Sequence, residues 1–307
     1  MNSKLIDKIW TAILYFISAM VVLLLLILLG YILIKGVGTL NLEFLFSDPK
    51  IGEAGGGIGP QLFNSFYMLL VSLIITVPIG IGAGIYLSEY AKEGFFLNVV
   101  RVSIETMASL PSIVVGLFGF LVFVKITNWG FTLLSGALAI SILNLPSLTR
   151  VSENAIKEAS KGIKEASLGL GATRFQTIKT VVLPSAIPQV LTGIILAAGR
   201  IFGEAAALLY TAGMSAPSLN FTANITSKAF PLNLMRPAET LAVYIWKVNS
   251  EAMIPDAARV ANGASAVLII MVLLFNILAR IIGKKYTKCI QGIIKEGKVW
   301  QLLKQRI

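Results

Sequence analysis

Long runs of apolar residues, separated by shorter polar and charged segments, dominate the pattern along this chain. The run from Trp10 to Ile34 is uncharged, and about 20 apolar residues are enough for a helix to cross the hydrocarbon core of a bilayer. Because this run is much longer than the apolar core of a signal peptide, we expect it to be retained as a helix. The whole pattern predicts six membrane spans, at about Trp10–Ile34, Asn64–Leu87, Thr106–Val124, Thr132–Leu148, Leu183–Ala212 and Ala264–Ile282.

The spans divide the chain into three parts. Residues 1–63 hold the first span and a glycine-rich external loop, residues 64–283 form an all-α membrane core, and residues 284–307 form a basic tail. Within the core, the apolar patch TLAVYIWK (Thr240–Lys247) is too short to span, so it predicts a helix at the surface or against the bundle.

The distribution of lysine and arginine predicts the orientation. Six spans place both termini on one side, together with the loop of residues 149–183, and that side carries more than twice as many basic residues as the other. Since basic loops stay on the cytoplasmic side, we expect both termini and the 149–183 loop to be cytoplasmic, and the 213–263 loop to be external.

Composition supports a membrane protein and excludes several kinds of chemistry. The chain is 56% hydrophobic and only 13% charged, whereas soluble domains carry about a quarter charged residues. The net charge of +11 fits basic loops that contact anionic lipid, and we expect no nucleic-acid partner because there is no soluble basic domain. The single cysteine, Cys289, and the absence of histidine predict no disulfide within the chain, no metal site and no cofactor.

Two glycine-containing stretches resemble nucleotide-binding loops but lack their chemistry. GIIKEGKV (Gly292–Val299) has Val299 where a phosphate-binding loop needs a hydroxyl to reach magnesium, and no buried strand precedes it. GIGAG (Gly80–Gly84) lies inside a predicted span, where small residues allow close helix packing. We therefore predict that this chain has no ATPase of its own and is not an enzyme.

The loop between the fourth and fifth spans predicts a helical hook. In EASLGLGATRFQTIKTVVLP (Glu165–Pro184), Gly169 and Gly171 break a first helix, and a second helix restarts after them. Pro184 suits the first turn of the next span. The exposed apolar side chains expected on this hook, Leu168, Leu170 and Phe175, are typical of an element that docks in a groove on a partner.

This segment resembles the EAA loop of ABC importer permeases, whose pattern is E-A-A-x3-G-x9-I-x-L-P. The pattern is matched at five positions, while Ser167 replaces the second alanine and Val181 replaces isoleucine. The resemblance implies a MetI-like type I importer permease fold, and a hook that docks into an ATP-binding subunit. The residues implied in this coupling are Glu165, Ala166, Ser167, Gly171, Leu183 and Pro184.

Other stretches are similar to phosphate-importer permeases, and more to their PstA type than to their PstC type. They are Gly57–Ala91, Ser109–Gly119 and GRIFGEAAALLYTAG (Gly199–Gly213), in which Ala205 and Ala207 replace a threonine and a proline of the PstA pattern. The resemblance implies a location in the bacterial cell membrane and transport of inorganic phosphate. The implied partners are a PstC-type permease, two PstB-type ATPases and an external PstS-type phosphate-binding protein.

Arg200 and Glu204 are two charges inside the apolar fifth span. They stand at i and i+4 and therefore share one helix face, and Arg200 lies about 24 Å beyond Pro184, near the middle of the bilayer or just outside it. An intramembrane arginine costs about 2.5–3.5 kcal/mol on insertion scales, so a functional role is favoured. We predict that the pair lines the substrate pathway at an interface with a second permease. The alternative is a structural pair whose members neutralise each other.

A permanently charged guanidinium fork suits a tetrahedral oxyanion. We hypothesise that the Glu204 carboxylate pairs with Arg200 when no substrate is present. It also accepts a proton from phosphate and repels sulfate, which has no proton to donate. A permease for another oxyanion or small solute, a stand-alone secondary transporter or channel, and a structural membrane scaffold remain as alternative functions.

Overall fold

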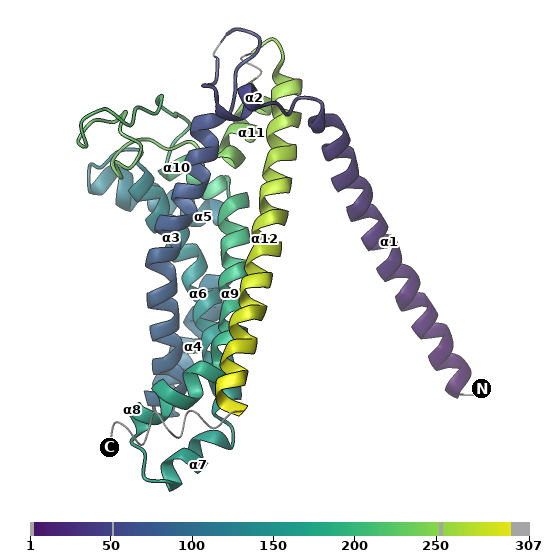
Figure 1. Cartoon of the computed structure of the whole chain (residues 1–307), viewed down its shortest axis with the longest axis vertical. Helices are drawn as coiled ribbons and strands as arrows, with labels where there is room; N and C mark the ends of the chain where they lie inside the picture. The colour runs from purple at the N-terminus through teal and green to yellow at the C-terminus, as the bar shows by residue number, and fades with distance from the viewer. Residues whose placement is uncertain (1–2, 51, 252–253, 296–307) are drawn as a thin grey trace.

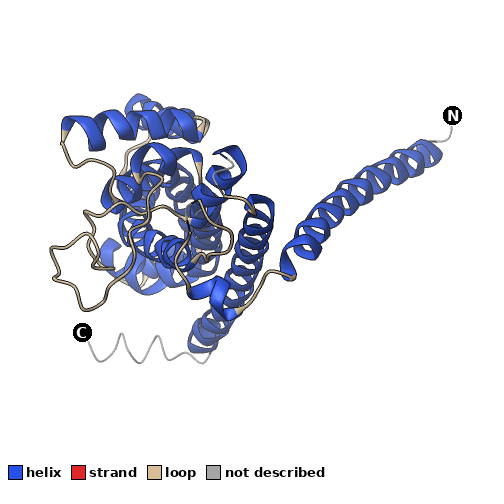
Figure 2. Cartoon of the chain, turned by 90° about the horizontal axis from the view of Figure 1, so that it is seen from above, coloured by secondary structure: helices blue, strands red, loops and turns tan. Residues whose placement is uncertain are grey.

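The computed structural model describes residues 3–50, 52–251 and 254–295, and within these ranges the chain forms helices joined by turns and loops, with no strand. The predicted all-α architecture is confirmed. Seen from the side, most helices form an upright bundle, and the first helix stands apart from it (Figure 1). Figure 2 shows the same separation from above. In chain order the elements are α1 (Ser3–Val37), α2 (Leu42–Phe46), α3 (Gly59–Ile85), η1 (Tyr86–Tyr90), α4 (Phe95–Ala108), α5 (Ser112–Gly119), η2 (Phe120–Ile126), α6 (Leu133–Ser160), α7 (Ile163–Gly169), α8 (Arg174–Thr177), η3 (Ile178–Val182), α9 (Leu183–Gly203), α10 (Ala206–Thr211), α11 (Leu241–Glu251) and α12 (Ala257–Lys295), where η marks π-helical turns.

Five helices are long and apolar enough to cross a membrane, and a sixth span results if α4 and the α5–η2 helix count as one. The sequence predicts one uninterrupted third span at Thr106–Val124. This prediction is wrong, because the stretch is divided between α4 and the α5–η2 helix, which meet at a bend of 98°. Pro111 explains the bend. It has no N–H to donate, it disfavours helix in the preceding residue, and it stands in an extended conformation (ψ 138°) just before α5.

The predicted fifth span, Leu183–Ala212, also differs from the structure at both ends. The helix runs without a break from Arg174 through η3 into α9, so Pro184 lies inside a continuous helix rather than at its start. The wider π-helical turn before Pro184 accommodates a residue that cannot donate to the preceding turn. At the other end α9 stops at Gly203, and the short helix α10 follows after Glu204 and Ala205.

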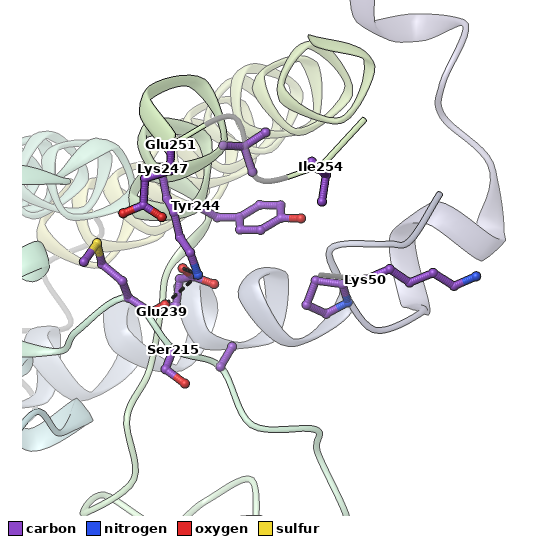
Figure 3. A pocket seen from close by; sticks show the side chains of 11 residues that line it. Lys50, Ser215, Glu239, Tyr244, Lys247, Glu251 and Ile254 are labelled. Atoms are coloured by element: carbon purple, nitrogen blue, oxygen red, sulfur yellow. Dashed lines mark hydrogen bonds and ion pairs between the residues drawn. The ribbon is translucent and has the colours of Figure 1, made fainter. Parts of the chain in front are cut away.

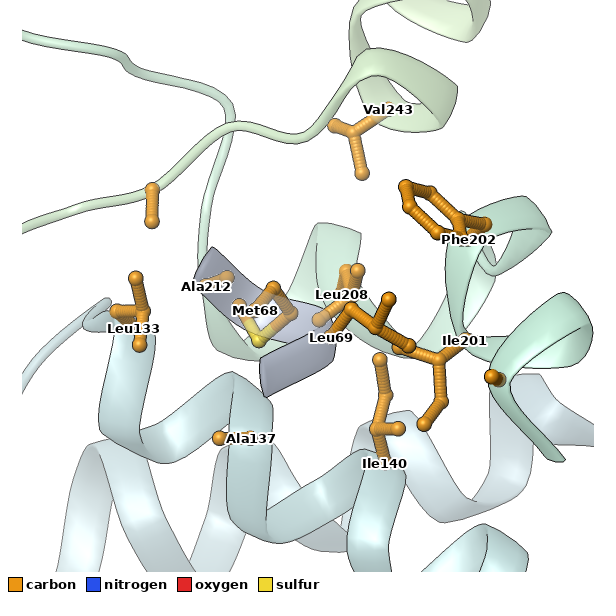
Figure 4. Packing of buried hydrophobic residues seen from close by; sticks show 12 residues of the cluster. Met68, Leu69, Leu133, Ala137, Ile140, Ile201, Phe202, Leu208, Ala212 and Val243 are labelled. Atoms are coloured by element: carbon orange, nitrogen blue, oxygen red, sulfur yellow. The ribbon is translucent and has the colours of Figure 1, made fainter. Parts of the chain in front are cut away.

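The core of the bundle joins α3, α6, α9 and α10, and it fixes the region around Arg200. Ile201 and Phe202, which follow Arg200, are each 2% exposed and lie within this core. Figure 4 shows how the side chains of the four helices converge. The buried apolar cluster consists of Met68, Leu69, Leu133, Ala137, Ile140, Ala198, Ile201, Phe202, Leu208, Ala212, Ala238 and Val243.

The glycines of GIGAG bring α3 close to α6, as predicted. A Cβ atom added at Gly80 would lie 3.0 Å from the Leu148 side chain, and one added at Gly84 would lie 2.5 Å from Ser152 Cβ. Gly82 faces open space. Two of the three glycines therefore permit the close approach of these helices.

Helix α1 leaves the bundle at an angle and touches it only near its C-terminal end. None of the residues in its most apolar stretch is buried. Its contact with α12 centres on Gly36, which packs against Asn262 and Ala266. The beginning of α1, the last described turns of α12, and α7 and α8 all lie at the same end of the molecule, which we call the elbow end (Figure 1). Residues 296–307 of the predicted basic tail lie outside the described residues.

Candidate functional site

The predicted hook is present at the elbow end, and we call α7, α8 and the turn between them the elbow. Helix α7 ends in a hydrogen-bonded reversal in which Gly171 N–H donates to Leu168 and Ala172 N–H donates to Ser167. Gly171 has φ +86°, a left-handed conformation that glycine adopts without strain. Helix α8 begins with a reciprocal cap between Thr173 and Gln176. The glycine of the EAA pattern thus has a defined geometric role in this turn.

The predicted coupling residues have different surroundings. Glu165, Ala166 and Gly171 are exposed, while Leu183 and Pro184 are partly buried in the helix that follows the elbow. The hydroxyl of Ser167 lies 2.9 Å from that of Thr177, which is buried, so this bond fastens α7 to α8.

The apolar side chains predicted to project from the elbow are exposed. Leu168, Leu170 and Phe175 retain 40%, 69% and 63% of their accessible surface. Three large apolar side chains on a polar loop are the kind of surface that a partner covers. Their role in docking stays a prediction.

Two contacts that the sequence does not predict attach the elbow to the end of α3. Lys164 Nζ on α7 lies 2.6 Å from the Glu89 carboxylate on η1. The Arg174 guanidinium lies 5.7 Å from the centre of the Tyr90 ring, within cation–π range. The sequence signal for the first contact was Glu89 itself, a carboxylate at the end of an apolar run, but nothing local identifies its partner.

A second charged cluster joins α4 to α6 near the elbow end. The Glu153 carboxylate, 7% exposed, lies 2.8 Å from Arg101 Nη2 and 2.9 Å from Lys157 Nζ. Arg150 and Glu105 form a further ion pair at 2.6 Å. The cluster holds the first helix of the bent pair against the bundle.

Arg200 and Glu204 do not share a helix face, because the helix ends between them. Arg200 lies in the last turn of α9, whereas Glu204 is extended (ψ 123°) and accepts a hydrogen bond from Ala207 N–H at 3.2 Å. Within the described residues, no ion pair or hydrogen bond from the Arg200 side chain is present. The alternative of a mutually neutralising pair is therefore not seen in this chain.

Arg200 belongs to an uncovered stripe along α9. Its side chain is exposed, and exposed residues recur at the spacing of one helix face. The neighbouring Phe202 packs edge-on against Phe66, which lies about 10 Å from the start of α3. Arg200 is therefore in the half of the bundle opposite the elbow end. The residues of the exposed stripe are Gln189, Thr192, Leu196, Arg200 and Gly203.

The end of the bundle opposite the elbow holds a buried polar network that the sequence does not predict. Arg236 is 0% exposed; it donates to the carbonyls of Pro231 and Pro237 and, at 2.6 Å, to the side chain of Asn64. Asn64 in turn donates to the Glu239 carbonyl. Burial lowers the pKa of Arg236 to about 10. The network fixes the 213–240 segment to the start of α3.

Glu239 lies at the edge of a small pocket beside this network, shown in Figure 3. Its carboxylate accepts from Gln61 at 2.9 Å and from Lys247 at 3.1 Å. Burial raises the pKa of Glu239, and the hydrogen bond from Gln61 and the charge of Lys247 oppose that rise. Tyr244 on α11, the helix predicted at Thr240–Lys247, lines the same pocket. Within the part of the chain that the structure describes, no group of three or more acidic, cysteine or histidine side chains could hold a metal ion.

Comparisons with known proteins bear on the whole chain. A family model described as "Binding-protein-dependent transport system inner membrane component" matches residues 77–288. The chain is 52% identical to the "Probable ABC transporter permease protein YqgI" of Bacillus subtilis (strain 168), over 92% of this chain and 97% of that protein. It is 34% identical to the "Phosphate transport system permease protein PstA" of Yersinia pestis, over 82% and 81% of the two chains.

Solved structures share the fold at low sequence identity. A chain of a bacterial alginate ABC transporter, crystallised with an alginate-bound periplasmic protein, aligns over 93% of this chain and 98% of its own length, with a TM-score of 0.63 and 15% identity. A chain of the MetNI methionine ABC transporter in an inward-facing conformation aligns over 74% and 94%, with a TM-score of 0.56 and 20% identity. These likenesses bear on the fold alone.

Proposed function

The chain belongs to the inner membrane components of binding-protein-dependent transport systems, and from this premise we propose that it is a permease subunit of an ATP-driven importer of inorganic phosphate. Permease subunits of this family are not catalytic. Phosphate as the substrate is supported by the similarity to PstA permeases and by an arginine with no internal partner on an uncovered helix face. That exposed Arg200 is the observation that carries the proposal.

The exposed stripe on α9 is the surface with which we expect this chain to take part in a pathway. A guanidinium facing only lipid costs several kcal/mol, so we expect the stripe to face a water-filled path shared with a second permease. A PstC-type subunit is the proposed partner on that side. Arg200 then offers two parallel N–H groups to phosphate, and Glu204 lies directly after it at the junction of α9 and α10.

The elbow is the proposed site of coupling to ATP. Its exposed apolar side chains dock into one of two PstB-type ATPases, and closure of the ATPase pair displaces the elbow together with the helix that continues from it. Because α8, η3 and α9 form one helix, the displacement reaches Arg200 directly. The pathway opens alternately to a loaded PstS-type binding protein and to the cytoplasm.

The proposal is tested with the assembled complex in proteoliposomes. Arg200→Ala should abolish ATP-dependent uptake of labelled phosphate, whereas co-purification of the partner subunits stays normal. Arg280→Ala removes another exposed arginine on a membrane helix, one that lies outside the stripe, and should leave uptake unchanged. Uptake by Arg200→Ala at the parental rate would refute the pathway role, and uptake of sulfate but not phosphate by the parent would refute the substrate.

A further inference from the structure

Glu89 is a charged residue buried at the elbow end of a membrane helix. It lies in η1, the π-helical turn that ends α3, and its side chain is 1% exposed. A carboxylate so thoroughly removed from water requires a partner charge. Lys164 supplies that charge from α7 at 2.6 Å, so the contact joins two elements that are far apart in the chain.

Lys164 precedes Glu165, the first residue of the EAA pattern, and the two side chains point in different directions. Glu165 is exposed on the outside of the elbow, whereas Lys164 reaches inward to Glu89. One turn of α7 therefore has a side free for a partner and a side attached to α3. The Arg174 guanidinium over the Tyr90 ring provides a second attachment to the same π-helical turn.

The end of α3 is in turn packed tightly on α6. The contact of Gly84 with Ser152 leaves no room for a side chain, and Gly80 packs on Leu148 in the same way. Close-packed helices move together rather than deform, so a force applied at Glu89 reaches both helices.

We propose that the Lys164–Glu89 ion pair is a positioning contact that carries displacement of the elbow into α3. The elbow moves α9 through the continuous backbone, and it moves α3 through this ion pair. Both helices therefore respond to the ATPase. This inference rests on the proposed coupling role of the elbow. The two residues touch neither substrate nor ATP; they set the ratio of phosphate imported to ATP hydrolysed.

The test measures phosphate uptake and ATP hydrolysis together in proteoliposomes that contain the complete complex. Lys164→Gln leaves the Glu89 carboxylate buried without its partner. It should lower uptake per ATP about fivefold or more, because removal of one partner of a buried ion pair destabilises the joined arrangement of the elbow and α3 by more than that factor. Lys161→Gln removes an exposed lysine just before α7 and should change neither rate. Lys164→Arg retains the charge and should keep most of the coupling.

Exchange of the charges distinguishes a coupling contact from a general loss of structure. Glu89→Lys alone places two ammonium groups together and should uncouple the complex, while Glu89→Lys combined with Lys164→Glu should restore uptake per ATP. A parental ratio in Lys164→Gln, or a charge exchange no better than the worse single variant, would overturn the inference.

The outcomes also separate this inference from the proposed function. If the parental complex imports no phosphate, the substrate proposal fails whatever these variants do. If Phe175→Ala leaves ATPase assembly and uptake intact, the coupling role of the elbow fails. If the other expectations hold but Lys164→Gln keeps the parental ratio of phosphate imported to ATP hydrolysed, only the proposed role of the ion pair is refuted.

Discussion

Glu204 is held where two helices meet, and its carboxylate is already engaged. It accepts the Ala207 N–H in the first turn of α10, while Arg200 lies at the end of α9 without an internal partner. A glutamine at position 204 keeps an oxygen for this hydrogen bond but removes the charge. The substitution therefore tests the effect of the negative charge while the hydrogen bond with Ala207 N–H is kept.

Glu204→Gln should relax the preference for phosphate over sulfate. We predict that the carboxylate accepts a proton from phosphate and repels fully deprotonated sulfate, so its neutralisation should let sulfate compete about tenfold better, the worth of about one hydrogen bond. Uptake of labelled phosphate in the presence of increasing sulfate measures the change. Glu204→Ala is the control that also removes the hydrogen bond with Ala207 N–H. Unchanged competition in Glu204→Gln would assign discrimination to another site or subunit.

Arg236 makes three side-chain hydrogen bonds that fix the 213–240 segment to the bundle. Arg236→Met keeps the volume but leaves the Asn64 side chain and two proline carbonyls without their donor. The stability lost should be about 2 kcal/mol or more, because each buried unpaired acceptor costs about 1–3 kcal/mol and the relief of a buried charge offsets only part of this. Thermal unfolding in detergent measures it. Lys228→Met, at an exposed position in the same segment, should leave the midpoint temperature of unfolding unchanged. An Arg236→Met variant as stable as the parent would show that the network is dispensable for stability.

At the scale of elements, the residues within the loop predict the shape of the elbow, but they do not predict its attachment to the end of α3. The glycine break and the helix restart follow from residues within the loop, and the structure shows both, with α7 ending at Gly169 and α8 starting at Arg174. The Lys164–Glu89 contact joins segments far apart in the chain, so no local pattern indicates it. The sequence does not predict the continuous helix through Pro184, because a π-helical turn has no clear sequence signal.

Gly171→Ala should loosen the elbow. At φ +86° an alanine is strained by about 1 kcal/mol, so local opening of α7 should be about fivefold more frequent. Hydrogen exchange of a peptide that covers residues 163–177 should accelerate accordingly. Gly169→Ala is the matched control, since Gly169 is helical and faces open space, so alanine there should slow exchange. Equal behaviour of the two variants would contradict the geometric role of Gly171.

For the whole molecule, the sequence predicts the number of spans better than their directions. Helix α1 is apolar on every side, so no face is marked for packing, and nothing in the sequence predicts that it stands apart from the bundle (Figure 1). The bend at Pro111 could have been anticipated from the proline, but its angle depends on what the two helices contact. Likewise, the network around Arg236 combines residues of α3 with a loop distant in sequence, and such buried polar partners emerge only from the folded chain.

The orientation in the membrane is the remaining whole-molecule prediction, and two engineered cysteines test it. The structure places the elbow and the 213–240 segment at opposite ends (Figure 1), and the excess of basic residues predicts that the elbow end is cytoplasmic. With Cys289→Ser as background, a membrane-impermeant maleimide applied to intact protoplasts should label Thr222→Cys, an exposed position in the 213–240 segment. Lys161→Cys, exposed beside the elbow, should react only after permeabilisation. The reverse pattern would invert the topology and would place the proposed ATPase-binding elbow outside the cell, which an importer driven by cytoplasmic ATP does not allow.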